Sequence, residues 1–281
     1  DAPSSFYFVP FSSQAGFLDD GSAPAIRAVK YDVSTLRDKI SALLADGCEV
    51  GVHGIDNWVD AHRGAIELSR IQDLTKIHRL GTRVHWLYFA EASPTALESA
   101  GYDYDSTSGY NEAVGYKAGT AQVFKPESTQ TLLELPLHIM DCALFYPDRL
   151  NLTMAEGTDL ITSMIEEAAN NGGVLTLNWH DRSIAPERLW GDVYRGALAS
   201  MRMKGARFLP AADVVEWFRK RRSVCFRPYR IDAPMEGISV DEGLVPEDGM
   251  ILRIYNPPGI DHKQSADRPY RDLPLSAAVN R

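Results

Sequence analysis

The chain has 281 residues, of which 44% are hydrophobic and 24% charged, and this composition is typical of a globular protein. Its formal net charge of -9 at pH 7 argues against a nucleic-acid partner, which would require a basic face. No apolar run approaches the ~20 residues of a membrane-spanning helix, and three dispersed cysteines indicate no disulfide framework, so we expect a cytoplasmic protein without a membrane span.

Strand-like and helix-like segments alternate along most of the chain. We expect strands at residues 5–9, 49–53, 83–88, 102–105, 132–138, 174–180 and 207–210. Amphipathic patterns predict helices at residues 33–45, 65–80, 159–169, 189–203 and 211–220. This alternation predicts an α/β fold, with a mostly parallel sheet or barrel that is covered by helices.

The composition changes after residue 222. Prolines then recur and separate short strand candidates around residues 238–240 and 250–255. We therefore predict two domains: residues 1–222 form the α/β domain, and residues 223–281 form a small β-rich extension with an irregular tail.

Residues 49–58, EVGVHGIDNW, are the most informative segment of the sequence. The pattern is typical of a buried strand that ends at His53, after which Gly54 permits a sharp turn towards Asp56. Ligands and catalytic groups of α/β proteins gather at the carboxyl ends of strands. His53 is therefore a candidate site residue, and a hydrogen-bonded core histidine is the alternative for this segment taken alone.

Polar and aromatic residues that can bind ligands also lie in or after the other expected strands. They are Arg83, His85, Trp86, Asp105, Lys117, His138, Asp141, His180 and Asp181. Four of the seven histidines thus lie at strand ends, where a barrel would bring them to one mouth. Because buried polar groups are costly unless they are satisfied, this concentration favours a site over a core.

Imidazoles and carboxylates together suit a divalent metal ion such as Zn²⁺. Such an ion polarises a carbonyl and lowers the pKa of bound water to ~7, and a separate histidine can protonate the leaving group. The residue types therefore indicate metal-assisted hydrolysis of an amide or ester. Cys142 has apolar neighbours and is expected to be a small core residue.

Individual roles follow from the order of these residues. We predict that His53 and Asp56 reach one metal ion from the same strand end, across the intervening glycine. His180 is expected to act as the general acid, oriented by Asp181 or Asp105.

A further group of residues is expected to share one pocket at the carboxyl ends of the strands. The group comprises Arg83, His85, Asp105, His138 and Asp141. The alternative for two of them is a structural ion pair between Arg83 and Asp105 at the rim.

These segments resemble those of the polysaccharide deacetylase family, the NodB-like carbohydrate esterases, in a divergent bacterial branch. The resemblance extends from residue 4 to residue 222. Residues 6–10, FYFVP, are similar to the family's second barrel strand, and residues 49–54, EVGVHG, to its histidine motif. Residues 83–87, RVHWL, stand in the place of its arginine motif, and residues 175–180, LTLNWH, resemble its closing motif with the catalytic histidine.

The resemblance implies a distorted (β/α)7 barrel that removes N- or O-acetyl groups from sugars, with a divalent metal ion, Zn²⁺, as cofactor. It implies His180, Arg83 and Asp105 as catalytic residues and His53, Asp56 and Asn57 as metal ligands. It also implies a carbohydrate bound by His85, Trp86, Lys117, His138, Asp141 and Asp181.

The sequence departs from the family pattern at three places. The family's first strand carries an Asp-Asp pair, but no such strand lies before Ser4, and the pair at residues 19–20 lies in a loop. We therefore expect an N-terminally incomplete barrel: either the chain is part of a longer protein, or the base is missing. Asn57 stands where the second metal histidine is expected, and Asp56 is the better ligand by chemistry. His85 replaces the proline that usually follows the arginine.

The favoured interpretation is a metal-dependent hydrolase that removes an acyl group from a carbohydrate. One alternative is a degenerate barrel that binds a glycan or protein partner without turnover. Another is an unrelated metal-dependent hydrolase of the barrel class.

Overall fold

The computed structural model describes residues 2–18, 20–188, 190–226, 238–240, 250–255 and 270–275. The chain divides into two compact units, Asp1–Val215 and Glu216–Arg281. The first unit contains every residue proposed above for the site. The domain boundary expected after residue 222 stays a prediction.

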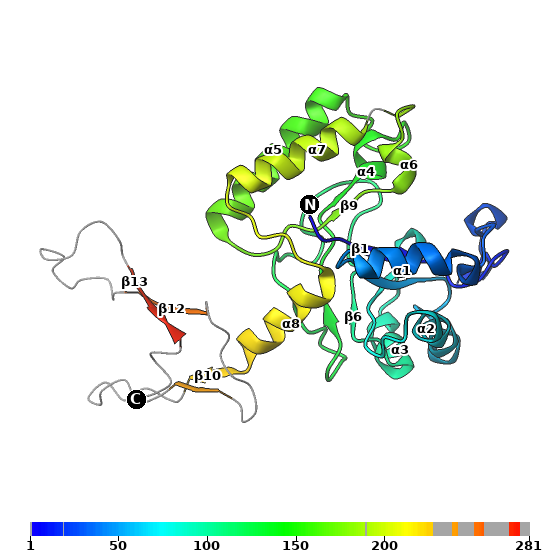
Figure 1. Cartoon of the computed structure of the whole chain (residues 1–281), viewed down its shortest axis with the longest axis horizontal. Helices are drawn as coiled ribbons and strands as arrows, with labels where there is room; N and C mark the ends of the chain where they lie inside the picture. Colours follow the sequence, from blue (N-terminus) through cyan, green and yellow to red (C-terminus); the bar gives the residue numbers. More distant parts are fainter. Residues whose placement is uncertain are drawn as a thin grey trace, which may run out of the picture. The chain divides into compact units, whose positions relative to one another are not determined.

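A five-stranded parallel sheet forms the centre of the first unit (Figure 1). Its strands lie in the order β1 (Ser5–Phe8), β4 (Glu49–Gly54), β5 (Thr82–Val84), β6 (Tyr104–Asp105) and β7 (Leu133–Glu134). Every neighbouring pair in this order is parallel. The carboxyl ends of β4 to β7 therefore meet at one edge of the sheet.

Two smaller strand pairs complete the described strands of this unit. The pair β8 (Ile139–Met140) and β9 (Leu177–Asn178) is parallel, and the pair β2 (Phe17–Leu18) and β3 (Gly21–Ser22) is antiparallel. The α/β class with a parallel central sheet is confirmed. Closure into a (β/α)7 barrel stays a prediction.

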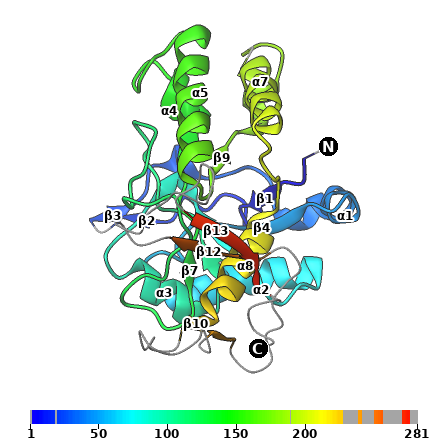
Figure 2. The same cartoon turned by 90° about the vertical axis from the view of Figure 1, so that its left-hand side faces the viewer.

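Helices connect the strands. The α-helices are α1 (Arg37–Ala45), α2 (Ala61–Thr75), α3 (Ser93–Ala100), α4 (Asp141–Phe145), α5 (Met154–Asn171), α6 (Asp181–Ile184), α7 (Trp190–Met203) and α8 (Ala211–Arg222). Short 3₁₀ turns are η1 (Ala25–Arg27), η2 (Val33–Leu36) and η3 (His85–Leu87). Helices α2 and α3 pack against each other, as do α5 and α7 (Figures 1 and 2). Within the described ranges, no helix combines the length and apolarity that crossing a membrane requires.

Two apolar cores hold these layers together. The first lies between β4 and the helices α1 to α3, and it includes Val52, Ile71 and Leu97. The second lies between α4, α5 and α7, and it includes Leu144 and Ile161. Full burial of one such side chain contributes about 1.5–3 kcal/mol, so these cores fix the strands whose ends carry the site.

The end of β4 depends on Gly54. A Cβ atom at this position would overlap the side chain of Asn57, so the tight turn after the strand requires glycine here. The turn leads into α2, whose first turn is capped by Asp60, because its carboxylate accepts a hydrogen bond from the backbone N–H of Arg63.

The second unit, described by itself, contains short antiparallel strand pairs. Strand β10 (Val224–Phe226) pairs with β11 (Ile238–Val240), and β12 (Ile251–Tyr255) pairs with β13 (Tyr270–Pro274). Asp19 and His262 lie outside the described residues.

Candidate functional site

Three of the four strand-end histidines, His53, His85 and His180, lie close enough for the charge of one to affect the pKa values of the other two. His53 belongs to β4 and stands opposite Arg83 of β5, and His85 follows β5 directly. The rings of His53 and His85 meet edge to face, with centroids 4.7 Å apart. Burial and nearby positive charges, including that of His180, lower the pKa of His53 well below its usual range and that of His85 to about 4. His53 and His85 are therefore neutral.

His180 differs because it is paired with a buried acid. Its ring Nδ1 donates to Oδ1 of Asp141 over 2.6 Å, and its backbone N–H donates to Oδ2 over 2.9 Å. Burial alone would lower the pKa of His180, but the hydrogen bonds and charges of Asp141 and of Cys142 together raise it to about 10. His180 is therefore an imidazolium at neutral pH, ion-paired with a fully buried carboxylate.

This geometry corrects the expected orientation of His180. The acid that orients it is Asp141, and not Asp181 or Asp105. Asp181 is exposed and accepts a hydrogen bond from the backbone N–H of Arg182, whereas Asp105 is buried beside Thr107.

The hydrogen bonds of the two neutral imidazoles fix their tautomers. Nδ1 of His53 donates to the carbonyl oxygen of Arg83 over 2.6 Å, which leaves Nε2 unprotonated. Nε2 of His85 donates to the carbonyl oxygen of Arg27 over 2.9 Å, which leaves Nδ1 unprotonated. That Nδ1 atom is buried and has no hydrogen-bond partner. Each ring thus offers one nitrogen lone pair.

Arg27 holds His85 from two sides. Its Nη2 donates to the carbonyl oxygens of Ile55 and His85, both over 2.9 Å, while its own carbonyl oxygen accepts from the His85 ring. Its Nη1 donates to Ala15 over 2.5 Å, and the guanidinium lies 4.3 Å from the centre of the Tyr88 ring. Arg27 is only 1% exposed, so this buried cation ties Ala15 and its own backbone to the end of β5.

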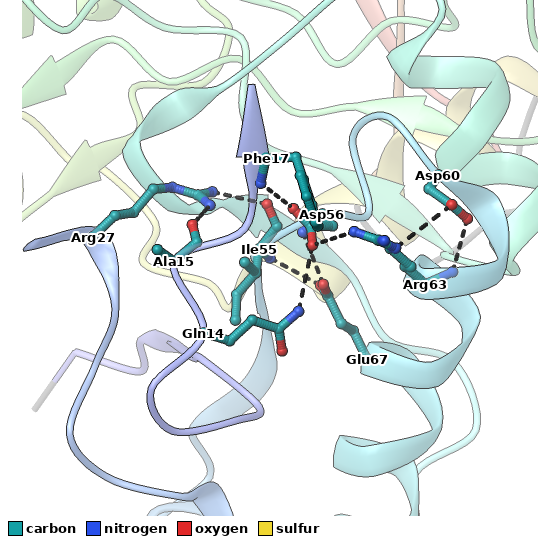
Figure 3. A network of polar contacts seen from close by, with 9 residues as sticks. All are labelled: Gln14, Ala15, Phe17, Arg27, Ile55, Asp56, Asp60, Arg63 and Glu67. Atoms are coloured by element: carbon teal, nitrogen blue, oxygen red, sulfur yellow. Dashed lines mark hydrogen bonds and ion pairs between the residues drawn. The ribbon is translucent and has the colours of Figure 1, made fainter. Parts of the chain in front are cut away.

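Asp56 is a member of the polar network in Figure 3, which closes the turn after β4. Its carboxylate is fully buried and accepts from the backbone N–H of Phe17 over 2.9 Å and from Nη1 of Arg63 over 3.1 Å. Glu67 reaches the same turn from α2 and accepts from the backbone N–H groups of Ile55 and Asp56 over 2.9 and 2.8 Å. Asp56 therefore stabilises the turn after β4 through these hydrogen bonds.

Asn57 is also fully buried in this turn. Its Nδ2 donates to Oγ1 of Thr82 over 2.9 Å. The metal-binding roles expected for His53, Asp56 and Asn57 stay predictions. Of these side chains, His53 has an unprotonated Nε2, and the Oδ1 atom of Asn57 is buried without a hydrogen-bond partner.

Arg83 connects the imidazoles to a pair of buried acids. Its carbonyl oxygen orients His53, and its guanidinium donates to the carbonyl oxygen and to Oγ of Ser106 over 3.0 and 2.8 Å. Asp105 and Glu134 face each other across β6 and β7. Burial raises the pKa of both carboxyl groups, and the charge of Asp105 raises that of Glu134 further. Ionisation of both acids of this pair at once is therefore disfavoured.

Sequence reasoning missed Cys142 as a member of the site. In the part of the chain that the structure describes, Asp141, Cys142 and His180 form a group whose possible ligand atoms lie within 4.8 Å of one another. The Cys142 sulfur lies 3.4 Å from Nδ1 of His180. The sequence feature that could have identified Cys142 is its position directly after Asp141, shortly beyond the strand expected at residues 132–138.

The remaining candidates lie in different surroundings. Both nitrogens of His138 bond to the backbone: Nδ1 accepts from Thr176 over 3.1 Å, and Nε2 donates to Thr120 over 3.5 Å. Trp86 is 40% exposed and has a left-handed backbone, with φ of 65°. Lys117 is exposed, and its Nζ donates to the carbonyl oxygen of Gly109 over 2.9 Å. The substrate-binding roles of these residues and of Asp181 stay predictions.

Comparisons with known proteins identify a similar fold. No protein-family model and no curated protein matches the chain. A solved structure from Mycobacterium smegmatis, described as a "putative polysaccharide deacetylase", is 20% identical and covers 83% of this chain and 76% of its own, with a TM-score of 0.55. A maltose-forming amylase from Pyrococcus sp. ST04 is 13% identical over 68% of this chain and 35% of its own, with a TM-score of 0.45. The chain therefore has a fold similar to that of the Mycobacterium smegmatis protein.

Proposed function

We propose that the protein is a hydrolase that removes an acyl group, such as acetyl, from a carbohydrate, with a divalent metal ion, Zn²⁺, as cofactor. The observation that carries this proposal is the ion pair of His180 and Asp141 beside the two neutral imidazoles of His53 and His85. The similar fold of a deacetylase-like structure and the resemblance of the strand-end motifs support the same reaction.

The charge states divide the roles among the histidines. Titratable groups whose pKa values are pushed apart mark the acid and its neutral neighbours. His180 carries a proton that it can transfer to the nitrogen or oxygen of the leaving sugar as the acyl bond breaks. Asp141 keeps the ring in one orientation throughout, because it accepts from both the ring and the backbone.

The donor chemistry of the neutral imidazoles fits a divalent ion of borderline softness. His53 would hold it, because Nδ1 is engaged with the carbonyl of Arg83 and Nε2 is unprotonated. When bound, such an ion supplies polarisation of the acyl carbonyl and a lowered pKa of the attacking water. Asp56 is left out of this assignment because its hydrogen bonds hold the turn, and Asn57 because amide oxygen is a weak partner for Zn²⁺.

Arg83 and Asp105 are assigned positioning roles. Arg83 orients His53 through its carbonyl oxygen, while its guanidinium balances the charge of Asp105 and Glu134. Replacement of Arg83 is expected to disturb both groups, because one residue serves the ring and the acid pair.

Trp86 is proposed to bind the carbohydrate through its exposed ring. Its ring is 40% exposed and lies beside that of His85, with centroids 6.0 Å apart. Aromatic faces offer large apolar contact area to a ligand, and the apolar face of a sugar ring suits such a surface. A large residue held at positive φ is unusual, and such strain occurs at functional sites.

The test is acetate release from N-acetylated and O-acetylated oligosaccharides by the full-length protein supplied with Zn²⁺. His180→Ala is expected to lose ~10²–10⁴ of the rate, whereas His62→Ala, on the exposed face of α2, keeps the rate. An oligosaccharide that binds without release of acetate would favour the non-catalytic barrel instead.

A further inference from the structure

We propose that His85 is a metal ligand, so that His53 and His85 hold one divalent ion between the ends of β4 and β5. The inference deepens the proposed function and rests on it only for the presence of a metal ion.

The backbone places the two rings together. Strands β4 and β5 are hydrogen-bonded neighbours in which His53 pairs with Arg83, and His85 lies two residues beyond that pair. The ring centroids are 4.7 Å apart and the ring planes are inclined by 73°. Two nitrogens at about 2.0–2.1 Å from a tetrahedral Zn²⁺ lie ~3.3 Å apart, and rings at this separation are compatible with that spacing.

The hydrogen bonds of both rings match those of metal-binding histidines. Such a histidine usually donates its other ring N–H to a carbonyl or carboxylate oxygen, and this bond fixes the tautomer. His53 donates Nδ1–H to Arg83, and His85 donates Nε2–H to Arg27. Both acceptors are backbone carbonyl oxygens, which cannot donate, so the proton position on each ring is set by its partner.

The free nitrogen of His85 requires an explanation. Its Nδ1 atom is buried without a hydrogen-bond partner, and leaving a buried polar atom unsatisfied destabilises the fold. The fold retains this atom while Arg27 holds both the ring and the backbone carbonyl oxygen of His85. A metal ion that accepts the lone pair would remove the cost.

Neighbouring groups are less suited to the ion. Asn57 donates to Thr82, and amide oxygen is a weak partner for Zn²⁺. In the group of Asp141, Cys142 and His180, Nδ1 of His180 carries the proton that Asp141 accepts. That nitrogen has no lone pair to offer until the ion pair with Asp141 breaks.

A metal ion held by these two histidines would keep coordination positions free for reactants. Two protein ligands leave at least two positions of a tetrahedral ion for water and for the acyl oxygen, whereas structural zinc sites are filled by protein. A site with two imidazoles is expected to bind more weakly than one with three ligands, so affinity is the property to measure.

The experiment measures Zn²⁺ affinity and the visible spectrum of bound Co²⁺ in the absence of substrate. His53→Ala and His85→Phe are each expected to lower the affinity by more than the ~10–100-fold that follows loss of a supporting residue. His62→Ala serves as the control and is expected to bind Zn²⁺ like the parent protein, whereas Cys142→Ser tests whether the group of Asp141, Cys142 and His180 binds the ion instead. Circular dichroism checks the fold of every variant.

His85→Phe keeps the ring against His53 and removes both nitrogens. If it unfolds, His85→Gln replaces it, because the amide can still donate to the carbonyl of Arg27. A folded variant of either kind that binds Zn²⁺ as tightly as the parent would overturn the proposal. Absence of Zn²⁺ binding by the parent protein would also overturn the proposal. A third contrary result would be loss of Zn²⁺ binding in Cys142→Ser, together with a thiolate-to-Co²⁺ charge-transfer band in the spectrum of the parent protein.

The result is independent of activity. A protein that binds Zn²⁺ through His53 and His85 but releases no acyl group would contradict the proposed hydrolase and leave this ligand assignment intact.

Discussion

Asp141 accepts hydrogen bonds from both the backbone N–H and the ring Nδ1 of His180. The acid opens α4 directly after β8, and the histidine follows β9, so a parallel strand pair brings them together. The carboxylate fixes the position of the ring and its charge at the same time. Asp141 therefore sets the orientation of His180 and, together with Cys142, its acidity.

Replacement of Asp141 by Asn is expected to lower both the pKa of His180 and the rate. The amide keeps the shape but removes the carboxylate charge, which together with Cys142 raises the pKa of His180 to about 10. The pKa measured by NMR titration should move towards the usual value of 6.5, and turnover should fall by ~10²–10⁴. Asp181→Asn, an exposed neighbour, serves as the control. An unchanged pKa in Asp141→Asn would disprove the pairing in solution.

Glu67 is expected to make stability depend on pH below neutrality. Burial raises its pKa from 4.5 to about 7, so the native state binds this proton more tightly than the unfolded state. The free energy of unfolding should therefore fall as the pH rises from 4.5 to about 7 and then level off. Denaturant titrations at a series of pH values measure this slope.

Replacement of Glu67 by Gln tests whether Glu67 causes this pH dependence of the free energy of unfolding. The slope should become shallower, because glutamine does not ionise. Above pH 7 the variant should also be less stable by about 1–3 kcal/mol, since its amide nitrogen cannot accept from the backbone N–H groups of Ile55 or Asp56. Glu91→Gln, on the surface, should keep the parent's slope. If the free energy of unfolding changes with pH equally in Glu67→Gln and Glu91→Gln, another group causes the pH dependence.

Replacement of Glu134 by Gln is expected to be tolerated. An amide resembles the protonated carboxyl, and it can donate to Oδ2 of Asp105, which lacks a hydrogen-bond partner. The free energy of unfolding should stay within about 1 kcal/mol of the parent at neutral pH. It should exceed the parent's at alkaline pH, where the parent must ionise a second buried carboxyl. A large loss at neutral pH would show that the pair carries no shared proton.

Replacement of Trp86 by Ala is expected to raise KM for an acetylated oligosaccharide and to leave kcat nearly unchanged. Loss of contacts that are equally strong in the ground and transition states has this signature. Steady-state kinetics measure it, with Phe89→Ala as the control, because Phe89 is similarly exposed at 44%. A fall in kcat without a change in KM would place Trp86 in support of His85 instead.

Much of the central architecture could be predicted because it follows from local patterns. The alternation of apolar strands and amphipathic helices predicted the parallel sheet, and His53 lies in β4 as expected. The strand expected at residues 83–88 ends at Val84, because Trp86 and Leu87 adopt left-handed backbone conformations that large residues seldom take. Residues 207–210 form no strand and lead into α8.

The partners of the site residues could not be predicted in the same way. The pairing of Asp141 with His180 spans 39 residues, and that of Asp56 with Phe17 also spans 39. Periodicity reports which face of an element is apolar, but it carries no information on contacts between distant loops. The sequence therefore indicates Asp181, next to His180, or Asp105, at the end of another strand, and not Asp141, which meets the ring in space.

Arg27 joins residues from separate parts of the chain into one wall of the site. Its displacement would strip the carbonyl oxygens of Ala15, Ile55 and His85 of their donor and leave the ring of His85 without its acceptor. Each orphaned group would add to the cost of opening, so a hinged movement of Arg27 is expected to be rare. We expect a substrate of the proposed hydrolase to approach past the exposed ring of Trp86, without displacement of this arginine.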